Sequence, residues 1–173
     1  MSRSDAPITK YPIQRFVGDI KGTSSIPKKI SAGIVDTVLD FSKRFHDLDD
    51  RRASHKPNRQ KWSAKEIIGH LIDSASNNHQ RFVRVQYLKD TNFPSYEQKE
   101  WVNLQRYNER PWSELLSLWK SYNLHLAHVL SRVRPEYLTA TCTIGSNDPV
   151  TFGYVAMDYL GHMQHHIKQL ENL

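Results

Sequence analysis

Hydrophobic residues recur at spacings of three and four in four stretches of the chain, which is typical of helices that bury one face. The first stretch follows Pro27 and ends near Asp49. Its apolar positions are Ile30, Ile34, Val38, Phe41, Phe45 and Leu48. The second begins at Ser63, which forms a capping-box pattern with Glu66, and reaches about Lys89. Both stretches predict long amphipathic helices.

Two further stretches with this spacing lie in the second half of the chain. The third begins at Pro111, a residue suited to a first helical turn, and ends before Pro135. Its predicted buried face comprises Leu115, Trp119, Tyr122, Leu126, Val129 and Val133. The fourth follows Thr151, a possible helix cap, and reaches nearly to Leu173. Its apolar stripe comprises Val155, Tyr159, Met163, Ile167 and Leu170.

The segments between these helices lack a sustained period. Residues 51–61 read as a charged loop, 90–110 as a long crossover and 139–150 as a loop rich in turn-forming residues. Residues 1–25 are polar and predict an irregular lead-in. With no convincing alternating strand, the pattern predicts one all-α domain over residues 1–173, a four-helix bundle with a long crossover loop.

Composition limits the possible classes of protein. Of the 173 residues, 38% are hydrophobic and 24% charged. Since a chain of this length buries roughly 70% of its surface, the core needs neither disulfides nor metal. The lone Cys142, the absence of a secretory signal and the lack of a long apolar run predict a cytoplasmic protein that does not enter a membrane. The net charge of +6 is spread over short clusters, so we expect a small-molecule substrate and no nucleic-acid partner.

The unusual feature of the composition is its nine histidines. His162 and His166 lie four residues apart at the edge of the fourth apolar stripe, so both imidazoles can reach one metal ion. Such a pair also arises by chance on exposed helices. His165 points further outward than His162. Asp158, one turn before His162, either orients that ring or is an exposed carboxylate.

A polar row on the second helix strengthens the hypothesis of a metal site. It consists of His70, Ser74, Asn77 and Arg81, beside the apolar face. Polar groups at the edge of a core need partners, so the row either lines a cavity or forms a satisfied core network.

The other histidines predict no ligand set. His125 lies at the edge of its stripe and is a weak candidate for lining a site, whereas His79 falls nearly opposite His70 and should be solvated. The remaining positions predicted at the surface are His46, His55 and His128.

Two segments carry a resemblance to a known family. KWSAKEIIGHLIDSASNNHQRF and DYLGHMQHHIKQL resemble the DinB-like superfamily, within it the YfiT-type metal-dependent hydrolases. YPIQRF and PSYEQKEWVNL are similar to the same branch, so the likeness covers nearly the whole chain. The resemblance implies a four-helix bundle of the DinB/YfiT type. It also implies a divalent metal, often nickel or zinc, held by His70, His162 and His166. It gives no ligand role to His165.

The chain also departs from the pattern of that branch. Gly69 replaces a histidine that often precedes the ligand of the second helix, and Ala75 replaces another family residue. Neither replacement removes a predicted metal ligand. The resemblance therefore does not imply that this chain has the same substrate as that branch.

The resemblance implies either hydrolysis or S-transfer from a low-molecular-weight thiol such as bacillithiol, and homodimers are common among relatives. Asp158 is the expected catalytic base, and Asn77 and Arg81 would line the substrate site, with Arg81 either meeting an anionic group or pairing with an acid of the crossover. Tyr96 and Trp101 either cover the site or pin the crossover. The alternative is a non-catalytic, stress-associated binding or dimerisation module with incidental metal.

Overall fold

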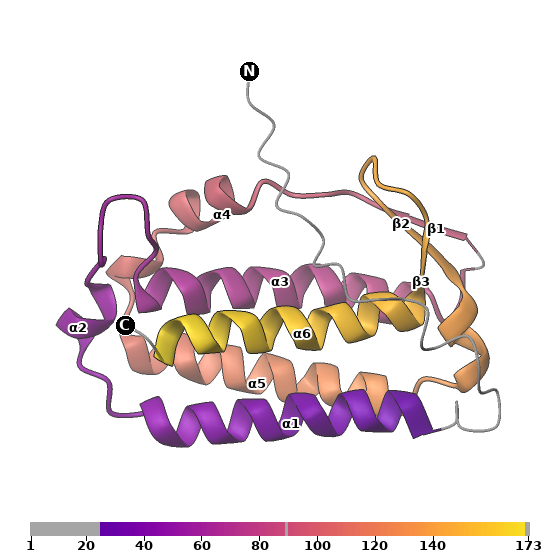
Figure 1. Cartoon of the computed structure of the whole chain (residues 1–173), viewed down its shortest axis with the longest axis horizontal. Helices are drawn as coiled ribbons and strands as arrows, with labels where there is room; N and C mark the ends of the chain where they lie inside the picture. Colours follow the sequence, from indigo (N-terminus) through magenta and orange to yellow (C-terminus); the bar gives the residue numbers. More distant parts are fainter. Residues whose placement is uncertain (1–24, 89, 172–173) are drawn as a thin grey trace.

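Four long helices form the body of the molecule (Figure 1). The computed structural model describes residues 25–88 and 90–171, so nearly all of the predicted lead-in lies outside the described residues. The bundle helices are α1 (Ile26–Phe45), α3 (Ala64–Arg84), α5 (Trp112–Ser131) and α6 (Phe152–Glu171). The predicted all-α bundle is confirmed. Within the described ranges, none of the helices has the length and apolarity needed to cross a membrane.

The long crossover between α3 and α5 determines the relative directions of the bundle helices. α5 and α6 each pack against both α1 and α3. Figure 1 shows α3 and α5 running in one direction and α1 and α6 in the other. Two consecutive long helices can run parallel only when the chain returns along the bundle between them, which the segment from α3 to α5 does. The antiparallel pair α3 and α6 carries the predicted histidines.

Most positions of the predicted apolar stripes form the core, while four half-buried ones pack against it: Phe45, Leu48, Tyr122 and Val129. Ile34, Val38 and Phe41 of α1 are fully buried, and the α6 stripe is at most 5% exposed. The Phe41 ring meets Trp119 edge-on, with the ring centroids 5.4 Å apart. Each buried side chain of this size stabilises the fold by about 1.5–3 kcal/mol. The Trp112 indole N–H donates to the Phe45 carbonyl at 2.7 Å, which ties the start of α5 to the end of α1.

The predicted caps fix where two helices begin. The Ser63 backbone N–H donates to Glu66 Oε2 at 2.9 Å, and the Glu66 N–H donates to Ser63 Oγ at 3.2 Å. This capping box starts α3 and thereby places His70 in its second turn. Thr151 Oγ1 accepts from the Tyr154 N–H at 3.3 Å at the start of α6.

The expectation of no strands is wrong. β1 (Asp90–Phe93), β2 (Thr141–Ile144) and β3 (Val150–Thr151) form a small sheet in the order β1-β2-β3, with β1 parallel to β2 and β2 antiparallel to β3. These strands are too short to show an alternating pattern. β1 also lies about fifty residues before its partner β2, so only the folded bundle brings this pair together, whereas β2 and β3 form a local hairpin.

Several predicted boundaries also need correction. The first helix ends at Phe45 and the second at Arg84, each about one turn early. The predicted loop 51–61 overlaps the short helix α2 (Asp50–Ser54), which Asp49 caps by accepting from two backbone N–H groups. The remaining short helices, absent from the prediction, are α4 (Gln98–Gln105), η3 (Tyr107–Glu109) and η4 (Pro135–Thr139).

The crossover is fastened to α3 through Gly69. A Cβ atom on Gly69 would lie 2.0 Å from Tyr107 Cδ2, so any larger residue collides with the ring. The Tyr107 hydroxyl donates to Asp73 Oδ1 at 2.6 Å, one turn along α3. Position 69 therefore has no room for a side chain larger than that of glycine.

We expect Gly69→Ala to destabilise the protein by about 1–3 kcal/mol despite alanine's better helix propensity, because the methyl group overpacks a rigid ring. Gly33→Ala is the matched control. Its Cβ would meet only the flexible end of Leu160, at 2.7 Å from Cδ2. Urea denaturation of both variants tests this prediction. Equal stability of the two would contradict it, as would the same cost for Gly69→Ala in a Tyr107→Leu background.

Candidate metal centre

His70 lies on the inner face of α3 and is completely buried. Its ring packs beside Trp62, with the ring centroids 5.1 Å apart. Since the capping box fixes the start of α3, His70 is held at a defined level of the bundle, facing α6.

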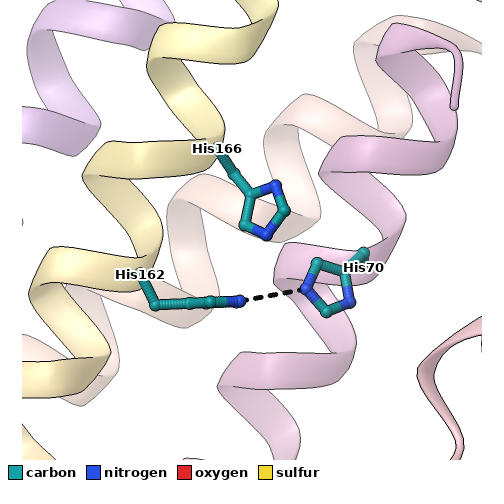
Figure 2. A group of neighbouring side chains, drawn as sticks. All are labelled: His70, His162 and His166. Carbon is teal, nitrogen blue, oxygen red and sulfur yellow. Dashed lines mark hydrogen bonds between the residues drawn. The ribbon is translucent and has the colours of Figure 1, made fainter. Parts of the chain in front are cut away.

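His162 and His166 of α6 complete a compact cluster with His70 (Figure 2). One ligand atom from each of the three residues lies within 4.8 Å of the other two. His70 Nε2 and His162 Nε2 are 3.1 Å apart, and the ring centroids of His70 and His166 are 4.8 Å apart. The three histidines that the resemblance marks as ligands are thus brought together, while their ligand role stays a prediction.

Burial keeps these imidazoles neutral. Desolvation first, and then the neighbouring His162 and His166, lower the pKa of His70 to about 2. Desolvation and the adjacent histidines likewise lower the pKa of His162 to about 3. Desolvation lowers the pKa of His166 to about 4. At neutral pH all three rings therefore keep a nitrogen lone pair for a ligand.

The cluster fits a divalent transition metal. Two nitrogens bound at 2.0–2.1 Å in a tetrahedral zinc site are about 3.3 Å apart, close to the 3.1 Å between His70 Nε2 and His162 Nε2. Imidazole donors without a carboxylate suit zinc, nickel, copper or iron rather than magnesium or calcium. His70 Nδ1 is buried and has no hydrogen-bond partner among the described residues.

Gln169 orients His166 and was missed by the sequence analysis. Gln169 Oε1 accepts a hydrogen bond from His166 Nδ1 at 3.0 Å. Because that nitrogen carries the proton, the Nε2 lone pair is left for the cluster. Gln169 Nε2 donates to His165 Nε2 at 2.9 Å. His165 is exposed and contributes no atom to the three-His cluster, in line with its exclusion from the ligand set.

The predicted polar row of α3 follows the same face away from the cluster. Ser74 and Arg81 are buried, whereas Asn77 is half-buried and donates to the Asp73 carbonyl at 2.9 Å. Asp158 of α6 is half-buried and makes no hydrogen bond to His162 among the described residues. Burial raises its pKa, and the Arg81 guanidinium partly offsets that rise. Asp158 therefore lies between the histidines along α6 and the charge of Arg81.

Two histidine expectations change. His79 is half-buried rather than solvated, because its ring packs edge-on against His125 with the centroids 5.1 Å apart. His79 Nδ1 also lies 3.3 Å from the Tyr122 hydroxyl. His125 belongs to this separate contact between α3 and α5 and does not join the cluster. The other predicted surface histidines are exposed, as expected: His46, His55 and His128.

The crossover supplies groups that the sequence did not reveal. Asp73 is buried in α3, and its Oδ1 accepts from Tyr107 and from Gln105 Nε2, each at 2.6 Å. Tyr96 and Trp101 contact each other, with the ring centroids 4.9 Å apart. The sequence does show Asp73, three residues after the predicted ligand His70. Its importance could be recognised only once its partners Tyr107 and Gln105 were known.

A known protein family matches most of the chain. The family model described as the DinB superfamily matches residues 37–170. The chain belongs to the DinB superfamily. This confirms the family resemblance carried by the histidine-containing segments of α3 and α6.

Relatives of this DinB-superfamily chain include two proteins named "putative metal-dependent hydrolase". The one from Oceanobacillus iheyensis is 24% identical over 164 residues, covering 95% of each chain. The one from Bacillus mycoides is 23% identical over 166 residues, covering 95% of this chain and 94% of the relative. The solved structure of YfiT from Bacillus subtilis, described as "a probable metal-dependent hydrolase with an unusual four-helix bundle topology", matches with a TM-score of 0.76. It is 17% identical and covers 84% of each chain, which supports the fold.

We predict near-stoichiometric divalent metal in protein purified without a histidine tag, measured by mass spectrometry. Because each of the three imidazoles would supply one bond, the substitutions His70→Ala, His162→Ala and His166→Ala should each lower the content to less than about a tenth. His165→Ala is the matched control, one residue from a predicted ligand, and should retain the metal. A site emptied by His165→Ala but not by His166→Ala would overturn the assignment.

The metal-free protein should lose stability as the pH falls below about 6.5, the ordinary pKa of histidine. Above that pH, the cluster is neutral in both the folded and the unfolded state. Below it, the unfolded state takes up protons first, because burial depresses the pKa of the folded His162 to about 3. Urea unfolding between pH 8 and pH 4.5 should give a shallower decline for His162→Gln than for wild type. His165→Gln should follow wild type, and parallel profiles for all three proteins would count against the effect.

Proposed function

We propose that this protein is a metal-dependent enzyme that acts on a small molecule at the three-His cluster, as a hydrolase or a low-molecular-weight thiol S-transferase. The observation that carries the proposal is the convergence of three neutral imidazoles, one buried and two half-buried, with no fourth His, Cys, Asp or Glu in the group among the described residues. Three protein ligands leave positions open for substrate, unlike the four ligands of a closed structural site. The names of the relatives support the metal-dependent part of the proposal.

The chemistry depends on the ligands and on the groups beside them. Zinc or nickel bound there would lower the pKa of a water molecule or hold a thiol as its thiolate. His70, His162 and His166 would hold the ion, and Gln169 would keep the His166 ring in its productive tautomer.

Asp158 is the proposed base for hydrolysis. It lies one turn before His162 on α6, and burial raises the pKa of its carboxyl. A pKa raised from its ordinary value brings a carboxylate closer to the range in which it accepts and returns a proton during turnover. S-transfer needs this base less, because a thiol ionises far more readily than water.

The location proposed for the enzyme is the cytoplasm. Cys142 is a free, buried thiol whose pKa is raised by burial, so it is inert as a nucleophile. A single unpaired cysteine supports a reducing compartment.

Metal-loaded protein should show metal-dependent turnover either on a panel of esters and amides or on low-molecular-weight thiols with a generic electrophile. Asp158→Asn should lower hydrolysis by about 10²–10⁴-fold, because a positioned base is lost, and should leave S-transfer within a few-fold of wild type. His162→Ala should abolish either activity, and His165→Ala should change neither. Full metal loading without turnover on both panels would favour the non-catalytic binding module.

A further inference from the structure

The row of polar residues on α3 ends in Arg81, a charge that makes no close ion pair with the described residues. Arg81 is only 8% exposed. Its Nη1 donates to Asn78 Oδ1 at 3.2 Å, and this neutral amide is its one hydrogen-bond partner among the described residues. No described carboxylate lies within ion-pair distance of Arg81, so among residues 91–110 no acid of the crossover pairs with it.

An arginine in this setting is costly. A guanidinium presents five N–H donors, and the bond to Asn78 uses one of them. Burial lowers the pKa of Arg81, an effect only partly offset by Tyr96, Cys142 and Asp158. Buried charges in proteins are normally paired and hydrogen-bonded. Arg81 therefore has the features of a side chain whose counter-ion is supplied by a bound ligand.

The position of Arg81 relative to the histidines sets the size of that ligand. Eleven residues separate Arg81 from His70 on α3, which is about 16 Å at 1.5 Å per residue. The contact with Asn78, three residues earlier, shows that the Arg81 side chain points back toward the His70 end of the helix. The guanidinium then lies roughly 10 Å from the level of the cluster, the length of a small organic molecule.

Groups from three other elements surround this end of the row. Asp158 comes from α6, Tyr96 from the crossover and Cys142 from β2, and all three interact electrostatically with Arg81. Burial raises the pKa of Tyr96, so its hydroxyl keeps its proton and can donate to an anion. The Asp158 carboxylate disfavours a second negative charge nearer the histidines.

We propose that Arg81 binds the carboxylate or phosphate group of the substrate, so that the enzyme acts on a small molecule with one anionic end and a reacting group about 10 Å away. The inference rests on the proposed function, since it assigns the other end of the substrate to the histidine cluster. Its test is nevertheless independent of turnover and of metal.

The experiment titrates metal-free protein with acetate or inorganic phosphate at constant ionic strength and follows the shift in melting temperature. Wild type should be stabilised by one of the two anions, and that anion identifies the group recognised. Arg81→Met, which keeps much of the apolar stem, should weaken binding of that anion by about tenfold or more, whereas Arg81→Lys should retain part of it. Arg84→Met, an exposed arginine one turn on, is the matched control and should behave as wild type.

Metal content of the same variants separates the two proposals. Arg81→Met should bind metal as wild type does, and His162→Ala should lose metal yet keep the anion response. If the anions stabilise wild type and Arg81→Met equally, or stabilise neither protein, the proposed role of Arg81 is overturned. The proposal for the metal centre would be unaffected. If Arg81→Met does not fold, a wild-type response in Arg81→Lys or Arg81→Gln would overturn it equally.

Discussion

The antiparallel packing of α3 against α6 is the constraint on which the rest of this structure depends. It places His70 against two histidines that lie one turn apart on another helix, and no local segment could do the same. The contact requires polar side chains within a bundle otherwise held by apolar stripes. Those polar groups reduce the stability that the same surface would give if it were apolar. Their retention is understandable when a ligand or a metal completes their bonding.

The crossover contributes to this arrangement from outside the bundle. Tyr107 covers Gly69, the residue directly before His70, and its hydroxyl reaches Asp73 on the next turn. The packing of the Tyr107 ring on Gly69 and the hydrogen bond from its hydroxyl to Asp73 together hold the crossover in place on α3. The glycine at position 69 is thus coupled to how this segment covers α3.

The sequence predicted the features that local physics controls. The stripe of α6 and the capping box at Ser63 depend on residues only a few positions apart, and both are found as expected. Strand β1 was missed because it gains its hydrogen bonds from β2, about fifty residues later, and β2 and β3 because each is too short to show an alternating pattern. The half-burial of His79 likewise depends on α5, whose placement beside α3 is decided by the whole bundle. The inward side of each helix could be predicted from periodicity, whereas the choice of neighbour could not.

The histidines of the cluster lie far apart in the sequence, which determines when they can meet during synthesis of the chain. His70 and His162 are 92 residues apart, so their approach closes a very long loop. On a ribosome, the chain through α5 would already carry His70 but none of the α6 donors. A metal ion would meet single imidazoles at that stage and bind them weakly. An ion held by all three histidines would therefore be acquired only after α6 has docked, so its binding would report that the bundle is complete.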